Sequence, residues 1–280
     1  MKFIEILKAF LIGIVQGITE WLPVSSTGHM ILFNSFLKLD VSEAFWDMFL
    51  VVIQLGSILA VLVLFWQRLN PFSVKKTKQE KKQILSLWFH VILAIIPSGI
   101  VGVLLDDWFD AHLHRAIPVA IALIVYGVIF LFLEHLPKRR GDEITSADAV
   151  SYRTAFLIGL FQILSLIPGT SRSGSTILGA MLLGLSRTAA AEFSFFMAVP
   201  TMLGAGGIKV LKFVTDGSAA ISGSEWCILA IGCATAFAVS LIVIRYLMDY
   251  VKRHSFAVFG VYRIILGALV IGAAMLGWIS

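Results

Sequence analysis

The chain has 280 residues, of which 59% are hydrophobic and only 14% are charged. Soluble domains carry about 25% charged residues, so this composition excludes an ordinary soluble enzyme and predicts a membrane protein. The net charge of +5 lies mostly in a few short segments between apolar runs, a pattern that suits membrane topology and lipid headgroups and argues against nucleic-acid binding.

The first apolar region, about 3–37, is interrupted by the polar stretch PVSSTGHMIL at 23–32. It is too long for one helix and too broken for two ordinary spans. Pro23 is predicted to end one helix, and the serines after it to cap the next. Non-helical backbone at membrane depth survives only where protein or water covers it. We therefore expect a re-entrant helical hairpin here.

Three full spans are predicted next, at about 43–66, 84–105 and 116–136. A second interrupted region, about 150–186, contains PGTSRSGSTIL at 168–178, and Pro168 is again expected to end a helix. Three more spans are predicted at about 190–214, 226–247 and 256–278. The fold class is thus an all-α polytopic membrane protein with six transmembrane helices and two re-entrant helical hairpins, in a single membrane domain over 1–280.

Comparing the chain with itself reveals an internal repeat at an offset of 146 residues. The segment AFLIG occurs at 9–13 and again at 155–159, and ten of the 24 positions from 9 to 32 are identical at this offset. Repeat one covers about 3–136 and repeat two about 150–278. Each repeat holds one hairpin and three spans, and three spans change sides. The second copy is therefore predicted to be inverted, as in many transporters.

Loop charges predict the orientation. Basic residues gather in the three loops expected to be cytoplasmic: Arg68, Lys75, Lys76, Lys78, Lys81, Lys82, Lys138, Arg139, Arg140, Arg153, Lys252 and Arg253. Acidic residues gather in the other two: Asp106, Asp107, Asp110, Asp216 and Glu225. The first hairpin then enters from outside and the second from the cytoplasm. Lys2 and Lys8 fall on the outer side and argue against this layout.

The two interruptions place polar side chains where a lipid-facing helix would carry leucine. The first supplies Gln16, Glu20, Ser25, Ser26, Thr27 and His29, and the second Thr170, Ser171, Arg172, Ser173, Ser175 and Thr176. The helix that starts after each loop offers free N–H groups and the positive end of its dipole to an anion. Together with the guanidinium of Arg172, these groups predict a phosphate pocket at the junction of the hairpins.

The repeat is asymmetric in its reactive residues, which favours one composite site. Glu20 aligns with Leu166, His29 with Ser175 and Ser26 with Arg172. Simpler interpretations exist for each. The hydroxyls of Thr170, Ser173 and Ser175 could be helix caps, Glu20 and Arg172 a structural ion pair, and His29 only hydrogen-bonded. Gln16 could simply satisfy the broken backbone.

The motifs closely resemble those of the undecaprenyl pyrophosphate phosphatase family, the bacitracin-resistance type. The resemblance rests on QGITEWLPVSSTGHMIL at 16–32 and PGTSRSGSTI at 168–177, supported by VVIQLGSILAVL at 51–62 and EFSFFMAVP at 192–200. It implies hydrolysis of undecaprenyl pyrophosphate to undecaprenyl phosphate, which recycles the lipid carrier of peptidoglycan synthesis and lowers bacitracin sensitivity. It also implies a multi-pass protein of the bacterial inner (plasma) membrane, with membrane lipid and no nucleic acid as partner. A homodimer is left open.

The resemblance assigns roles to individual residues. It implies a catalytic set of Glu20, Ser26, His29 and Arg172. The remaining residues are expected to bind substrate: Gln16, Ser25, Thr27, Gly28, Ser171, Ser173, Gly174 and Thr176. Family members carry Glu or Gln at the position of Gln16, followed by Glu at that of Glu20. The divalent cation expected from the family, Mg²⁺ or Ca²⁺, would here have Glu20 as its one carboxylate ligand.

The hypothesis for the mechanism is that Ser26 attacks the terminal phosphorus while His29 and Glu20 handle its proton. A second hypothesis makes His29 the nucleophile. The competing function is a lipid-phosphate flippase or an anion transporter, since the inverted repeat alone does not separate these classes from an enzyme. The first hairpin enters from outside, which predicts an active site open to the periplasmic side.

Overall fold

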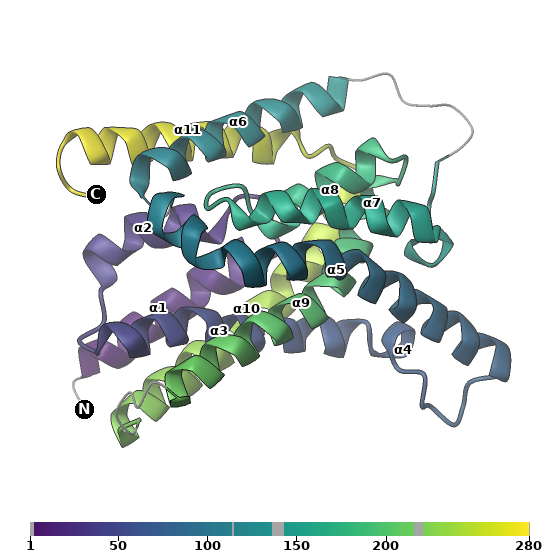
Figure 1. Cartoon of the computed structure of the whole chain (residues 1–280), viewed down its shortest axis with the longest axis horizontal. Helices are drawn as coiled ribbons and strands as arrows, with labels where there is room; N and C mark the ends of the chain where they lie inside the picture. Colours follow the sequence, from purple (N-terminus) through teal and green to yellow (C-terminus); the bar gives the residue numbers. More distant parts are fainter. Residues whose placement is uncertain (1–2, 114, 136–142, 216–220, 280) are drawn as a thin grey trace.

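The computed structural model describes residues 3–113, 115–135, 143–215 and 221–279, with the backbone alone for 34–36, 106–107 and 110–111 (Figure 1). Within these ranges the regular structure is helical, apart from one isolated parallel bridge between Ile144 and Leu185. The all-α prediction is confirmed. Some side chains behind the orientation prediction lie outside the described residues: Lys2, Asp106, Asp107, Asp110, Lys138, Arg139, Arg140 and Asp216.

Six helices are long and apolar enough to cross a membrane, which confirms the six predicted spans. They are α3 (Glu43–Leu64), α5 (Lys78–Leu113), α6 (Ala116–His135), α9 (Arg187–Thr215), α10 (Gly223–Val251) and α11 (Ala257–Met275). The first turns of α5 precede its predicted apolar span because the sequence there, KQEKKQ, consists of strong helix formers. Large apolar side chains such as Phe132 and Ile242 are more than 60% exposed, as lipid-facing side chains would be.

Four shorter helices form two pairs. The first pair is α1 (Phe3–Thr19) with α2 (Ser26–Leu37), and the second is α7 (Tyr152–Ile163) with α8 (Arg172–Leu182). Short 3-10 turns at Ala147–Ala149 and Leu164–Leu166 flank α7, and the single-turn α4 (Trp66–Leu69) follows α3. In each pair the chain doubles back through a loop, which we call the first loop (residues 20–25) and the second loop (residues 164–171).

Hydrogen bonds join the open ends of each pair. Lys8 Nζ on α1 donates to the Lys38 carbonyl just after α2 at 2.7 Å, and Asp40 N donates to Glu5 Oε2 at 2.9 Å. Near α7 and α8, Ile144 N donates to Gly184 O at 2.9 Å. Within each pair, the start of the first helix therefore lies on the same side of the molecule as the end of the second helix.

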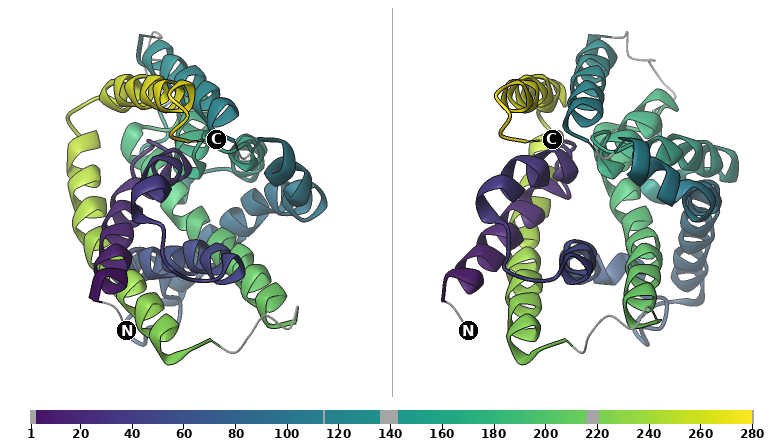
Figure 2. Two further views of the ribbon diagram at one scale, coloured as in Figure 1. Left: turned by 90° about the vertical axis from the view of Figure 1, so that its left-hand side faces the viewer. Right: turned by 60° about the vertical axis from the view of Figure 1, so that its left-hand side comes forward.

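The first helix of each pair packs against a long helix of the other predicted repeat. A Cβ added to Gly13 of α1 would lie 2.7 Å from Gly232 O of α10, and one added to Gly159 of α7 would clash with Ala94 O of α5. Such close backbone approach is typical of packed membrane helices. The helix α3 lies between α9 and α10 (Figure 2), while α6 and α11 pack side by side over both pairs (Figure 1).

Polar contacts define the two ends of the molecule. At one end, Arg68 of α4 pairs with Asp148 and Glu192, both at 2.6 Å. Burial opposes the charge of Arg68, yet the two carboxylates outweigh it and raise the pKa of the guanidinium. Because Arg68 and Asp148 come from two loops predicted to be cytoplasmic, these loops share one face. At the other end, a hollow is lined by Glu5, Asp40 and Glu225.

Candidate functional site

The first and second loops end in the same unusual backbone geometry. Ser25 has φ 71° and Ser171 has φ 72°, and these are the only non-glycine residues with positive φ in the described part of the chain. Each is the N-cap of the helix that follows: Ser25 Oγ accepts from Gly28 N at 3.3 Å, and Ser171 Oγ accepts from Gly174 N at 3.2 Å. The predicted caps are confirmed, and their positions differ by the repeat offset of 146.

This geometry is strained, and strain of this kind is concentrated at functional sites. A non-glycine residue at positive φ costs about 1–3 kcal/mol and persists only where its surroundings enforce it. The turn brings the first N–H groups of α2 and α8, which have no intrahelical acceptor, to the tips of the two loops. Both loops can therefore offer N–H donors to an anion.

The structure corrects the prediction that Pro23 and Pro168 end their helices. The helix α1 ends at Thr19, and α7 ends at Ile163, each several residues before its proline. Proline disfavours the helical conformation of the residue before it, and in both loops the chain leaves the helix earlier still. The loops are thus longer than the sequence predicts, and Glu20 lies in the first loop itself.

An ion pair between Glu20 and Arg172 joins the two loops. Arg172 Nη2 lies 3.0 Å from Glu20 Oε1, with side chains only 10% and 5% exposed, respectively. Gln16 Nε2 donates to the other carboxylate oxygen at 2.8 Å. The structure therefore brings together three predicted site residues that are up to 156 positions apart. The ion pair considered for Glu20 and Arg172 from the sequence is present.

The rest of the Arg172 guanidinium is held by α9 and by an aromatic ring. Nη1 donates to Ser194 O at 2.9 Å, and the guanidinium carbon lies 5.6 Å from the ring centroid of the buried Trp21. The third guanidinium nitrogen, Nε, is buried and has no acceptor among the described residues. Arg172 is thus fixed in orientation while its Nε–H stays available to a further acceptor.

Other predicted residues at the start of α8 hold this arrangement in place. Ser173 Oγ donates to Glu20 O at 3.1 Å, and Thr176 Oγ1 is hydrogen-bonded to Ser194 Oγ at 2.6 Å. Ser171 Oγ and Ser173 Oγ are 3.1 Å apart. These hydroxyls thus connect the α8 N-terminus to the first loop and to α9. The cap interpretation considered for Thr170, Ser173 and Ser175 is wrong, because Ser171 caps α8. Thr170 Oγ1 donates to Leu164 O and Ile167 O, and Ser175 Oγ lies 3.4 Å from the Tyr126 hydroxyl.

His29 is hydrogen-bonded through both ring nitrogens. Nδ1 lies 2.7 Å from Ser25 O, and Nε2 lies 2.7 Å from the hydroxyl of Tyr262 on α11. A carbonyl can only accept, so the proton of the neutral ring is assigned to Nδ1. Nε2 then carries the lone pair and accepts from Tyr262. The available lone pair of His29 faces Tyr262, whereas the mechanism predicted from sequence pairs His29 with Ser26.

Ser26 and Thr27 occupy the first two positions of α2. Both are half-buried, and within the described residues neither hydroxyl has a hydrogen-bond partner. Ser26 lies three residues before His29, so the two share one face of the helix. The hydroxyl of Ser26 is therefore available to a ligand at the α2 N-terminus. Gly28 and Gly174, the other predicted residues at these N-termini, are buried.

The side chains at the loops do not form a metal site of their own. Both oxygens of Glu20 already accept hydrogen bonds, from Arg172 and Gln16. Within the described residues there is no cluster of three His, Cys, Asp or Glu side chains that could hold a metal ion. Mg²⁺ and Ca²⁺ require six or more oxygen ligands. The donor set around Glu20 therefore does not fit an ion held by the protein alone.

Three residues of the site were missed at the sequence level. Ser194 binds both Arg172 and Thr176, Tyr262 binds His29, and Arg263 donates to carbonyls of both loops. Ser194 lies inside EFSFFMAVP, and Arg263 is a charge inside a predicted span. An ionisable residue at membrane depth is by itself a signal of function. That signal could have identified Arg263.

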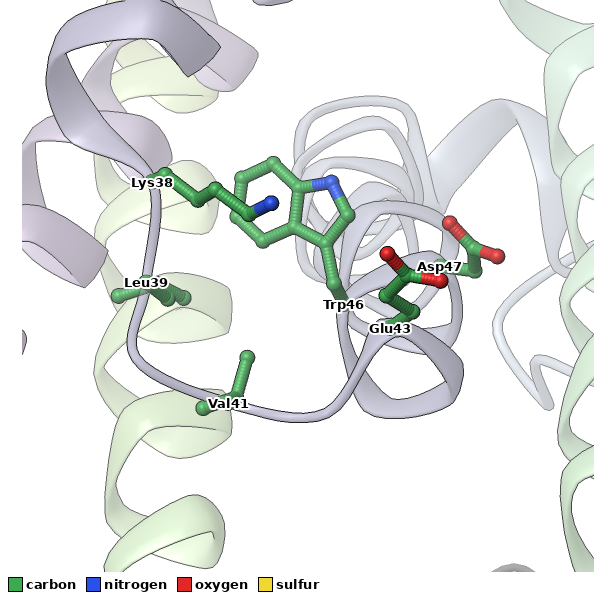
Figure 3. Close-up of a pocket in the computed structure, with 6 residues that line it drawn as sticks. All are labelled: Lys38, Leu39, Val41, Glu43, Trp46 and Asp47. Atoms are coloured by element: carbon green, nitrogen blue, oxygen red, sulfur yellow. The ribbon is translucent and has the colours of Figure 1, made fainter.

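A pocket at the connection between α2 and α3 lies outside this site (Figure 3). It is lined by Lys38, Leu39, Val41, Glu43, Trp46 and Asp47. None of the predicted site residues contributes to it. The site at the two loops is instead recognised by its buried charges and by the geometry of the helix N-termini.

Comparison with known proteins agrees with the motifs of the two loops. Residues 9–269 match the family model described as bacitracin resistance protein BacA. The undecaprenyl-diphosphatase of Enterococcus faecalis is 57% identical over 273 residues, which cover 97% of this chain and 98% of the relative. The undecaprenyl-diphosphatase of Streptococcus equi subsp. equi (strain 4047) is 54% identical over 271 residues, 97% of each chain.

The chain belongs to the BacA family. The family match and these identities over nearly the whole length confirm the resemblance drawn from the two motifs. The relatives carry the name of a phosphatase, which supports the enzyme over the transporter alternative.

Proposed function

We propose that the chain is a membrane undecaprenyl-diphosphatase that works where its two loops meet. It hydrolyses undecaprenyl diphosphate to undecaprenyl phosphate and inorganic phosphate, which recycles the lipid carrier and confers bacitracin resistance. The observation that carries the proposal is the Glu20–Arg172 pair, which joins a carboxylate of the first loop to the guanidinium of the first residue of α8 at 3.0 Å. A buried carboxylate paired with a guanidinium at the N-terminus of α8 suits phosphoryl transfer better than anion transport.

The diphosphate is bound by donors from both loops. Arg172 Nε, buried and without an acceptor in the described residues, donates to a phosphate oxygen. The first N–H groups of α2 and α8 donate to others. Gly174 has no side chain and leaves room at this position, while the hydroxyls of Thr27 and Ser173 come from the first turns of α2 and α8. Arg172 also stabilises the charge that develops on the equatorial oxygens in the transition state.

Hydrolysis proceeds through an enzyme-bound phosphate. The Ser26 hydroxyl attacks the terminal phosphorus, and its proton passes to His29 Nε2 once Tyr262 releases this atom. The bond from that phosphorus to the bridging oxygen breaks, and undecaprenyl phosphate leaves. Water then attacks the phosphoserine and releases inorganic phosphate. Glu20 orients Arg172 throughout and accepts no permanent proton in this scheme.

The alternative nucleophile is His29, whose Nε2 lone pair would itself attack phosphorus. The two mechanisms leave the phosphate on different atoms, so they are separable by trapping. Rapid quench of the enzyme and undecaprenyl diphosphate in denaturing detergent at neutral pH, followed by mass spectrometry of the peptide 21–32, locates the phosphate. Phosphate that survives acid but not alkali, and maps to Ser26, supports the scheme. An acid-labile, alkali-stable phosphate on His29 overturns it.

The divalent cation expected from the family remains a prediction. The residues around Glu20 do not fit a protein-held ion, because both carboxylate oxygens are engaged. An ion that enters with the diphosphate would add charge neutralisation at the phosphate oxygens. The residue roles above are complete without it.

The orientation is also a proposal. The basic loops around Arg68 share one face, which we assign to the cytoplasm by the positive-inside rule. The start of α1 and the end of α2 then lie on the outer side, beside Glu225. The start of α7 and the end of α8 lie on the inner side. Opposed re-entrant pairs in an inverted repeat account for this arrangement. The matching caps at Ser25 and Ser171 support the same repeat.

The direct test of function is phosphate release from undecaprenyl diphosphate by the purified chain in detergent. We expect phosphate and undecaprenyl phosphate in equal amounts from the native protein, and a rate at least about 10³-fold lower from Arg172→Ala. A folded native protein that binds the lipid but releases no phosphate would contradict the proposal. It would favour transport of the intact lipid instead.

A further inference from the structure

Arg263 lies on α11 within the last membrane span, and its side chain is completely buried. Three of its nitrogens donate to backbone carbonyls: Nη2 to Gly169 O at 2.8 Å, Nη1 to Pro23 O at 3.1 Å and Nε to Leu123 O at 3.5 Å. Pro23 belongs to the first loop and Gly169 to the second. One planar guanidinium therefore holds both loops against α6 and α11.

The carbonyl of Gly169 is accessible to Arg263 because of a backbone conformation suited to glycine. Gly169 has φ +97°, in the left-handed region, and a Cβ added there would lie 2.6 Å from Val119 O. Nη1 also lies 3.2 Å from where a Cβ of Gly174 would be. Arg263 is thus within contact distance of the first turn of α8, whose N–H groups are proposed to bind the diphosphate.

Arg263 differs from Arg172 in having no carboxylate partner among the described residues. Its guanidinium carbon lies 5.3 Å from the ring centroid of Tyr126, and its hydrogen bonds go to carbonyls. Glu20 is already neutralised by Arg172. A buried charge that lacks a counter-ion is costly, so the loops carry one positive charge in excess. An anionic ligand at the helix N-termini would lower that cost.

We propose that Arg263 is a positioning residue for the phosphatase reaction. It fixes the distance between the α2 and α8 N-termini by holding Pro23 O and Gly169 O on one rigid fork. It also supplies the uncompensated positive charge behind the two loops. The proposal rests on the function assigned above for its kinetic consequence, whereas the clamp itself is a property of the protein without substrate. Arginine suits this role because lysine offers no planar fork.

The kinetic test compares three variants on undecaprenyl diphosphate in detergent. Arg263→Met removes the charge and the fork at similar volume, and Arg263→Lys keeps only the charge. Arg245→Met on α10 is the matched control, because Arg245 is exposed. We expect kcat to fall about 100-fold for Arg263→Met and about tenfold for Arg263→Lys, with KM changed less than about threefold, because misplacement of groups by about 1 Å has effects of this size.

The structural test measures the distance between the loops without substrate. Nitroxide labels are placed at Phe33→Cys on α2 and Leu182→Cys on α8, both exposed positions, after Cys227 and Cys233 are replaced by serine. Double electron–electron resonance should give one narrow distance distribution for the parent protein and for Arg245→Met. We expect a clearly broader distribution for Arg263→Met and an intermediate one for Arg263→Lys.

The two tests have separate consequences. Loss of kcat with an unchanged distance distribution would overturn the clamp, as would native kcat in Arg263→Met. Failure of both Arg263 variants to fold, judged by size-exclusion and thermal unfolding, would overturn it too, because the residue would then serve the whole fold. If the parent protein releases no phosphate but the distribution still broadens, the proposed function fails and the clamp stands.

Discussion

The first and second loops share their backbone and differ in their chemistry. Ser25 and Ser171 have the same positive φ and the same cap to a glycine N–H three residues on. Yet the first loop carries Glu20 and is followed by His29, whereas the second is followed by Arg172. Duplication explains the common scaffold. The different side chains fit the proposal that the two loops act together.

The shared backbone and the differing side chains are two separate parts of the candidate site. The scaffold, consisting of a strained cap and a helix N-terminus with free N–H groups, occurs in both loops, and in the proposed function it offers the diphosphate donors from two sides. The proposed reactive groups occur once, as expected if a single phosphorus is attacked from one direction. Glu20 and Arg172 join the halves by an ion pair, and Arg263 joins them through their backbones.

The largest effect on activity should come from removing the guanidinium of Arg172, which pairs with Glu20 of the first loop. Arg172→Ala deletes the proposed transition-state donor, and we expect kcat/KM to fall by about 10³-fold or more. It also leaves Glu20 buried without a counter-charge, which costs about 3–5 kcal/mol of stability. Phosphate release and the midpoint of thermal unfolding in detergent measure the two effects.

The double variant Glu20→Gln/Arg172→Ala separates the loss of activity from the loss of stability. It carries no unpaired carboxylate, so stability should largely return while activity stays lost. Recovery of turnover together with stability would mean that Arg172 is only a structural partner of Glu20.

The next largest effect on activity is expected at Ser26, whose equivalent position in the second repeat holds Arg172. Ser26→Ala should lower kcat by about 10²–10³-fold, because it removes the proposed nucleophile. Its hydroxyl has no partner among the described residues, so unfolding should be unchanged. The matched control is Thr27→Val, which should lower kcat/KM by less than about tenfold. Equal losses for the two variants would leave Ser26 without a special role.

A smaller and symmetric effect is expected at the two caps. Ser25→Ala and Ser171→Ala each remove a cap but keep the strained φ, so each should destabilise the protein by about 1 kcal/mol. The glycine variants should be less destabilising, because glycine accepts positive φ without strain. Denaturation midpoints for the four variants test whether the scaffolds are equivalent. A loss of stability at only one of the two serines would show that the two caps do not contribute equally to the stability of the fold.

The smallest effect is expected on metal binding. In the native chain Gln16 donates to Glu20, whereas Gln16→Glu places two carboxylates on one helix face. Titration of substrate-free protein with Mn²⁺, followed by electron paramagnetic resonance, should show no tight site in the native chain and a measurable one in Gln16→Glu. A native site that Glu20→Gln abolishes would contradict the proposed absence of a protein-held ion.

Much of this architecture could be predicted from the sequence because its signals are local. A span needs about 20 apolar residues, and the windows at 43–66 and 116–136 meet that condition directly. The N-caps Ser25 and Ser171 could be predicted from residue type and from the repeat. Their positive φ could not, because serine adopts it only when surrounding contacts enforce it.

The remaining contacts of the site depend on distant parts of the chain. Tyr262 reaches His29 across 233 residues, and Ser194 reaches Arg172 across 22. Neither residue stands out within its own helix, since a single tyrosine or serine is common there. Arg263 is the exception, because a charge in a predicted span has to be satisfied by partners elsewhere in the fold.

The central claim is that the two loops form a single active site, and a double-mutant cycle tests it most directly. Ser26→Ala from the first pair, Arg172→Lys from the second and the double variant are compared for phosphate release from undecaprenyl diphosphate. Groups that act as one unit are strongly non-additive, so we predict that the double variant loses no more activity than Ser26→Ala alone. Losses that multiply would show that the two loops act independently and would contradict the single composite site.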